Sequence, residues 1–186
     1  MNKQTKTLFR DGAFLADIWT ELAEDAVYSG QNLVLVPFAQ AIEYLKAGRE
    51  MPEDFGVQVG SADDVEALAP FLGSIAVISL NFPSFADGRG FSSARLLRER
   101  LKFTGEIRAS GHYILDQMPF LKRCGVDAFM ISSDKVRAGL ERGEWPEVTH
   151  YYQPVAGDGA GGVASRPWLR RKVEVPDQRE SRTRGA

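Results

Sequence analysis

Five short strand-like segments alternate with five helix-like segments through the middle of the chain, and this alternation constrains the fold more than any other feature. Strands that alternate with helices pair in parallel through helical crossovers. We therefore expect an α/β fold in which alternating βα units build a mainly parallel sheet. The predicted strands span residues 33–36, 57–59, 75–80, 106–109 and 128–131, and the predicted helices span about 39–47, 61–72, 92–101, 114–123 and 134–142.

Two architectures fit five βα units. One is an open doubly wound sheet, and the other is a partial (β/α) barrel, since a complete barrel usually needs about 200 residues or more. Both bind ligands at the carboxyl ends of their strands. The expected position of a site is therefore the same for either architecture.

Small polar residues mark the predicted helix starts because their side chains accept hydrogen bonds from free backbone N–H groups. Gly125 is suited to end the fourth helix. The residues suited to start helices are Ser61, Ser92 or Ser93, and Ser133 or Asp134.

The 186 residues suffice for about one domain with a tail. We predict an N-terminal leader segment over residues 1–30, with a helix from about Asp17 to Tyr28, and an α/β domain over residues 31–156. Residues 157–186 are rich in Gly and then in Arg, which is typical of a flexible tail. The tail carries seven basic and four acidic residues, so its net charge of +3 suits either a solvated segment or a contact with an acidic partner.

Composition excludes several classes of protein. The net charge of −2 argues against general binding to nucleic acid. A single cysteine, Cys124, excludes an internal disulfide bond and fits a reducing, cytoplasmic location, and we expect its side chain to be buried. The uncharged stretch over residues 67–86 contains Pro70, Gly73 and Pro83, so we predict no membrane span. The two histidines are far apart in sequence and predict no metal site.

The loop after the third predicted strand is the first candidate site. Glycines, hydroxyls and arginines precede a helix start there, an arrangement that attracts anions. We predict that Asp87 moves a proton; alternatively, Asp87 only caps the turn. The residues predicted to bind an anionic substrate in this loop are Arg89, Gly90, Ser92 and Ser93.

The segment after the fourth predicted strand is the second candidate. Arg108 could add a charge to the substrate site, and His112 could act as a general acid or base, oriented by Asp116. The alternative is that His112 is an ordinary surface or capping residue. The sequence contains no recognisable flavin, nicotinamide or iron–sulfur motif, so the cofactor stays unknown.

Several of these segments together resemble a bacterial family of unknown function whose members are labelled oxidoreductases involved in sulfite reduction. Genes of this family lie beside those for assimilatory sulfite reductase and phosphoadenylylsulfate reductase. The similarity extends over about residues 7–153. The segments that carry it span residues 8–12, 17–19, 81–92, 96–98, 105–109, 116–121 and 124–129.

The resemblance implies a cytoplasmic protein of sulfur assimilation and cysteine biosynthesis. Two functions follow as expectations. The first is an accessory partner of assimilatory sulfite reductase. The second is a small α/β oxidoreductase or other enzyme that binds an anionic substrate, such as sulfite, phosphate or a nucleotide, at the loop after the third strand.

Overall fold

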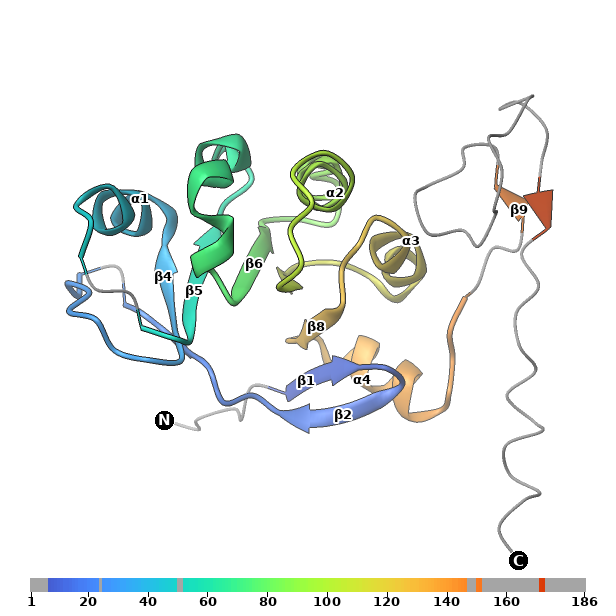
Figure 1. The fold of residues 1–186 in the computed structure, drawn as a ribbon. Coiled ribbons are helices and arrows are strands. Elements are labelled where there is room, and N and C mark those ends of the chain that lie inside the picture. The colour runs from blue at the N-terminus through green and yellow to red at the C-terminus, as the bar shows by residue number, and fades with distance from the viewer. Residues whose placement is uncertain (1–6, 24, 50–51, 147–149, 152–170, 173–186) are drawn as a thin grey trace, which may run out of the picture. The chain divides into compact units, whose positions relative to one another are not determined.

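A computed structural model describes residues 7–23, 25–49, 52–146, 150–151 and 171–172 (Figure 1). The chain divides into two compact units, residues 1–145 and 146–186. In the second unit, strands β9 (His150–Tyr151) and β10 (Arg171–Lys172) pair antiparallel. The other residues of the predicted tail lie outside the described residues, and the predicted domain boundaries stay predictions.

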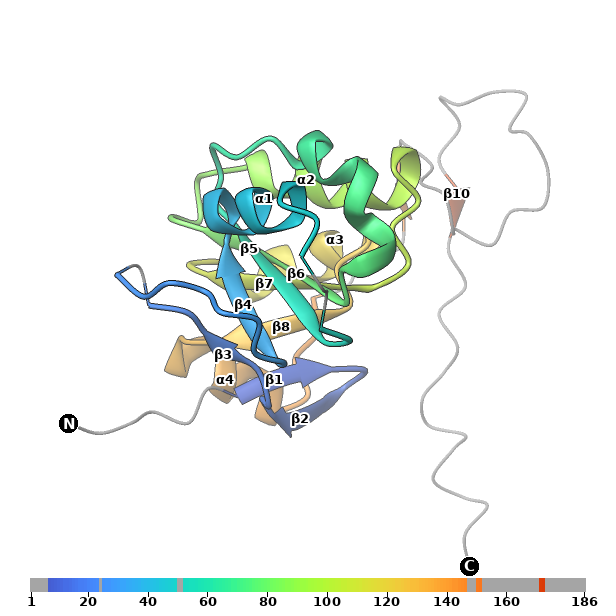
Figure 2. The ribbon, with the colours of Figure 1, turned by 60° about the vertical axis from the view of Figure 1, so that its left-hand side comes forward.

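An eight-stranded sheet forms the centre of the first unit (Figures 1 and 2). Its strand order is β2-β1-β8-β7-β6-β5-β4-β3. Neighbouring strands from β3 to β8 are parallel, whereas β1 pairs antiparallel with both β2 and β8. The prediction of an α/β fold is confirmed, but the sheet is mixed. The strands are β1 (Thr7–Arg10), β2 (Ala13–Ala16), β3 (Thr20–Glu21), β4 (Val34–Pro37), β5 (Phe55–Val59), β6 (Val77–Phe82), β7 (Glu106–Gly111) and β8 (Ala128–Ile131).

Helical segments connect the consecutive strands from β4 to β8, and α1, α2 and α3 cover the outer face of a curved sheet (Figure 1). The parallel strands follow the order of the chain without the reversal that a doubly wound sheet requires. The sheet is therefore a half-barrel. The helical segments are α1 (Phe38–Lys46), η1 (Val65–Ser74), α2 (Arg89–Arg95), η2 (Leu96–Arg100), η3 (Leu115–Gln117), α3 (Met118–Arg123) and α4 (Asp134–Glu141).

The predicted helix from Asp17 to Tyr28 is wrong, because strands β1, β2 and β3 occupy residues 7–21 and no helix follows them up to Tyr28 within the described residues. Asp11 and Gly12 form the turn between β1 and β2 with φ values of 50° and 80°. Asp-Gly is a strong signal for such a tight hairpin turn. The hairpin buries Phe9 in the main core and Leu8 against Met130.

Two predicted helix starts are also wrong. Asp64 caps η1 in place of Ser61, because the Asp64 side chain accepts the hydrogen bond from the Glu66 N–H at 2.9 Å. The helix α2 begins at Arg89 and not at Ser92 or Ser93. The predicted start of α4 is confirmed, with Ser133 as its N-cap.

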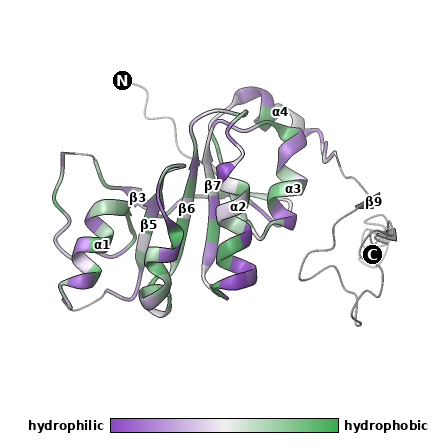
Figure 3. Cartoon of the chain, turned by 90° about the horizontal axis from the view of Figure 1, so that it is seen from above, coloured by the Kyte–Doolittle hydropathy of each residue, from purple (hydrophilic) through white to green (hydrophobic). Residues whose placement is uncertain are grey.

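The two faces of the sheet differ in polarity. Alternate residues of β6, such as Ile78 and Phe82, pack in the core under the helices. These helices carry both hydrophilic and hydrophobic residues (Figure 3). This mixture is typical of a helix that packs an apolar side against a sheet and exposes a polar side to water. The opposite face carries Ser79 and Arg108, which are paired in register on β6 and β7.

A three-residue segment, 17–19, joins the two edge strands of the sheet, β2 and β3. Such a segment spans at most about 14 Å, so the two edges lie close together. Asp17 forms an ion pair of 2.8 Å with Arg108, and both side chains are almost fully buried. The Trp19 ring lies 5.6 Å from the Arg108 guanidinium group. The segment therefore crosses the inner face of the half-barrel.

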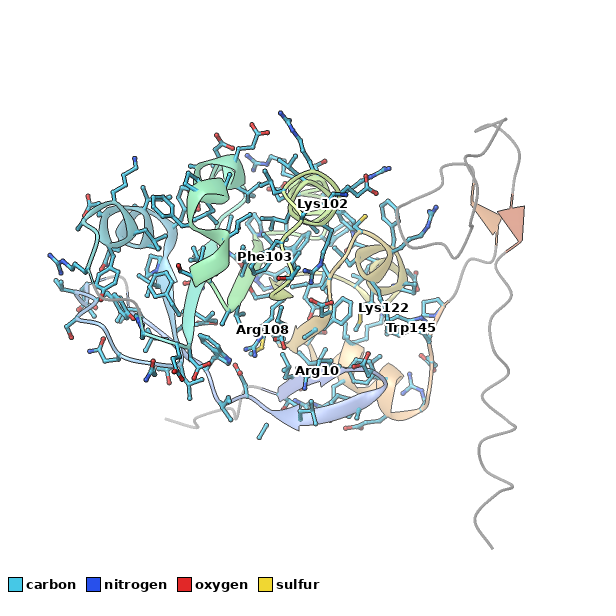
Figure 4. The ribbon with its side chains drawn as sticks, in the orientation of Figure 1. Arg10, Lys102, Phe103, Arg108, Lys122 and Trp145 are labelled. Atoms are coloured by element: carbon cyan, nitrogen blue, oxygen red, sulfur yellow. The ribbon has the colours of Figure 1, made fainter. Side chains whose placement is uncertain are left out.

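Two further charged groups, the half-buried Glu106 and the exposed Arg10, extend this cluster toward the surface. Glu106 accepts hydrogen bonds from Arg108 and, at 2.7 Å, from Arg10. Arg10 and Arg108 both lie on the side of the sheet away from α1, α2 and α3 (Figure 4). None of the helices within the described residues is long and apolar enough to cross a membrane.

Candidate functional site

A cavity of about 370 Å³ opens where β6, β7 and β8 end. Parallel α/β sheets bind ligands at this end of their strands because backbone groups and connecting loops are free there. The cavity is lined by Pro83, Ser84, Phe85, Gly111, His112, Tyr113, Ile114, Ser132 and Ser133.

The turn at Gly111 positions His112 in this cavity. Gly111 has a φ of +90°, and a Cβ atom at this position would lie 2.4 Å from the carbonyl oxygen of Phe82. Only glycine fits such a close approach without strain. The His112 N–H donates a 2.7 Å hydrogen bond to the same Phe82 oxygen. The chain therefore leaves β7 in a fixed direction, with the exposed His112 side chain at the cavity.

Hydroxyl groups supply most of the other polar lining. Ser132 donates a 3.0 Å hydrogen bond to the Gly111 carbonyl, and Ser133 accepts one from the Val136 N–H. Tyr113 is buried and donates to the Met130 carbonyl at 2.7 Å. Burial raises the pKa of the Tyr113 phenol, which stays protonated at neutral pH. No carboxylate is among the lining residues that the structure describes.

Asp87 and Arg89, predicted to move a proton and hold an anion, instead bind each other. Two hydrogen bonds of 3.0 and 2.7 Å join the Arg89 guanidinium group to the Asp87 carboxylate, which also accepts the Arg89 backbone N–H at 3.1 Å. These bonds hold the pKa of Asp87 well below its usual range. An anion at the start of α2 would compete with a carboxylate that is already there.

The other predicted loop residues have mainly local contacts. A Cβ atom on Gly90 would lie 2.4 Å from the Phe82 ring, so Gly90 allows α2 to pack on β6. Ser93 donates a 3.3 Å hydrogen bond to the Arg89 carbonyl, and Ser92 is exposed on α2.

The structure does not bring the predicted site residues together. Arg108 lies on the inner face of the sheet with Asp17, and Asp116 is exposed in η3. Of the predicted residues, only His112 is among the described residues that line the cavity. The sequence analysis missed Ser132 and Ser133 as lining residues, although they directly follow the fifth predicted strand.

Three large apolar side chains of the loop after β6 and of the segment that runs from Ile114 into α3 are exposed, and we call them the apolar patch: Phe85, Ile114 and Phe120. Their exposed fractions are 61%, 45% and 48%. Phe85 and Ile114 line the cavity, whereas Phe120 stacks on Phe91 with ring centres 5.1 Å apart. Gln117 ties these segments together by donating a 2.8 Å hydrogen bond to the Phe85 carbonyl.

Two further observations concern metal-binding side chains and the single thiol. No group of three His, Cys, Asp or Glu side chains that could hold a metal ion occurs within the described residues. Cys124 is buried, as predicted, and burial raises the pKa of its thiol.

Comparisons with known proteins give one match. A model of a family described as "Bacterial protein of unknown function (DUF934)" matches residues 56–161, which is more than half of the chain. The matched range contains every described residue that lines the cavity, and the whole apolar patch. Searches of curated proteins and of solved structures found no match.

Proposed function

The chain belongs to the DUF934 family of bacterial proteins of unknown function, and we propose that it serves assimilatory sulfite reduction as an accessory partner of sulfite reductase. In this function the protein acts in the cytoplasm and contributes to sulfur assimilation and cysteine biosynthesis. The expectation comes from the sequence resemblance described above. The structure adds a surface on which a protein partner could dock.

The apolar patch is the observation that carries this proposal. Large apolar side chains grouped on a surface mark interaction sites, because leaving them in water has a free-energy cost that a partner removes. Phe120 is half exposed, stacks on Phe91 and is not among the described residues that line the cavity. Its exposed ring is therefore available to a protein partner and separate from the cavity lining. Aromatic side chains of this kind are frequent among the residues that dominate binding energy at interfaces.

A pull-down from cells grown on sulfate as the sole sulfur source tests the docking surface. We expect the tagged full chain to retain sulfite reductase, and Phe120→Ser to weaken this binding by about tenfold or more. The matched control is Val27→Ser, because Val27 is 83% exposed but follows β3, away from the apolar patch. The proposal fails if the wild-type chain retains no sulfite reductase, or if both variants retain it equally.

A second candidate function is a small oxidoreductase or other enzyme that acts on an anionic substrate such as sulfite, phosphate or a nucleotide. It is favoured by the cavity, because Ser84 and Phe85 of the loop after β6 share it with His112. In this function His112 moves a proton, and Arg89 exchanges its pairing with Asp87 for the substrate. Arg89→Ala should then raise KM, and His112→Ala should lower kcat. Unchanged growth on sulfate with both variants would count against this function.

A further inference from the structure

We propose that the cavity at the ends of β6, β7 and β8 binds a small organic oxyanion, that is, a carboxylate, sulfonate or phosphate ester with an apolar body. The charged oxygens would lie against the Ser84 and Ser133 hydroxyls and the His112 imidazole. The apolar body would lie against Phe85 and Ile114. The inference rests on the second candidate function for the position of the site, and it shares Phe85 and Ile114 with the proposed docking surface.

The polar lining selects for negative charge. Ser84 and Ser133 offer hydroxyl donors, and His112 offers a ring N–H, whereas Ser132 already donates to the Gly111 carbonyl. The described lining contains no Asp or Glu side chain that would repel an anion. Ser133 also caps the eight-residue helix α4, whose positive end adds to this preference. Asp134, the first residue of α4, is exposed and is not among the described lining residues.

The size and the walls of the cavity select for an organic body. A volume of about 370 Å³ lies at the lower end of the range for small-molecule sites and exceeds the needs of a bare inorganic anion. Phe85 and Ile114 form apolar walls that are still accessible to water, with 61% and 45% exposed. Covering them with an apolar group would remove this area from water and stabilise the complex.

Calorimetric titration of the full chain with three probes separates these contributions. Benzenesulfonate has both an oxyanion and an apolar body, sulfate has only the oxyanion, and benzamide has only the apolar body. We expect benzenesulfonate to bind at least about tenfold more tightly than either of the other two. Equal binding of benzenesulfonate and benzamide, or no saturable binding of benzenesulfonate, would overturn the inference.

Variants then locate the bound probe. His112→Ala and Ser84→Ala should each weaken benzenesulfonate binding by about fivefold or more, because each removes a donor to a charged oxygen. Both side chains are exposed, so both variants should fold. Ser74→Ala is the matched control, since Ser74 is an exposed serine just before β6, at the opposite end of that strand. Wild-type affinity in both cavity variants would place the ligand elsewhere and refute the site.

The same titration distinguishes this inference from the two proposed functions. Phe120→Ser should bind benzenesulfonate like the wild-type chain, even where it loses sulfite reductase, because Phe120 is not among the described lining residues. Binding of benzenesulfonate by a chain that catalyses no reaction would support the ligand site and count only against the second candidate function, a small enzyme. A tenfold loss of benzenesulfonate binding in Phe120→Ser would show that the probe binds against Phe120 and not in the cavity.

Discussion

At the scale of single residues, two glycines at the start of α2 have opposite surroundings. A Cβ atom at Gly90 would lie 2.4 Å from the Phe82 ring, whereas one at Gly88 would meet nothing within 4 Å. The Phe82 ring is itself buried in the core and has little room to move. Packing of α2 on β6 therefore requires a glycine at position 90, whereas packing places no such requirement on position 88.

We expect Gly90→Ala to lower the free energy of unfolding by about 1–3 kcal/mol, because it overpacks the contact between α2 and β6. Gly88→Ala should leave stability unchanged or raise it by about 0.4–1 kcal/mol, since Gly88 has an ordinary φ of −83°. Urea denaturation of the two variants measures both changes. Equal stability of the two variants would show that the Phe82 ring adjusts without cost.

The sequence predicts an anion site in the loop after β6 from its residue types. The pairing of Asp87 with Arg89 explains why those residue types are not sufficient evidence for such a site. The sequence correctly indicates an acidic, a basic and several small residues ahead of a helix. Whether the arginine is available to a ligand depends on a bidentate contact two residues away, which composition does not reveal. His112 differs, because the strict geometry at Gly111 directs the chain toward the cavity.

At the scale of elements, the segment 17–19 closes the half-barrel through one buried ion pair. Asp17 and Arg108 are 3% and 4% exposed, and 91 residues separate them in the chain. Removing one partner of a buried pair leaves an uncompensated charge, which is strongly destabilising. Glu106 also contacts Arg108 and would offset part of that loss.

Asp17→Asn should therefore lower the free energy of unfolding by about 3 kcal/mol, near the lower end of the range for breaking a buried ion pair. Asp11→Asn is the matched control, because Asp11 and Lys122 form a 4.0 Å pair with both side chains largely exposed. This control should change stability by less than about 1 kcal/mol. Urea denaturation compares the two variants, and similar losses would refute a closing role for Asp17.

The elements themselves were predictable to different degrees. Strands β4 to β8 lie within about two residues of their predicted positions. For β4, β6 and β8 the reason is a nearly continuous apolar run, which is typical of buried parallel strands. The β1–β2 hairpin was predictable, because the Asp11-Gly12 pair is typical of a hairpin turn. The pairing of β1 with β8 was not predictable from the sequence, because it depends on contacts between residues more than a hundred positions apart.

At the scale of the whole molecule, two buried tyrosines make the free energy of unfolding depend on pH in the alkaline range. Tyr28 is buried, packs edge-on against Tyr44 and Phe55, and donates a 2.7 Å hydrogen bond to the Gln31 carbonyl. Burial and the neighbouring Tyr44 raise the pKa of Tyr28 to about 12. Burial also raises the pKa of Tyr113.

In the unfolded chain both phenols lose their protons near pH 10. Between about pH 10 and pH 12 the folded state therefore binds more protons than the unfolded state, and stability must fall as the pH rises. Each of the two groups contributes a slope of up to about 1.4 kcal/mol per pH unit in this window. Urea denaturation at pH 9, 10 and 11 should show this decline.

Tyr28→Phe tests the assignment. At pH 9 the variant should be about 1 kcal/mol less stable than the wild-type chain, because it loses the hydrogen bond to Gln31. Its stability should then fall less steeply above pH 10, since phenylalanine has no proton to release. The difference between the two proteins should therefore shrink as the pH rises. A constant difference from pH 9 to pH 11 would mean that Tyr28 ionises alike in the folded and unfolded states.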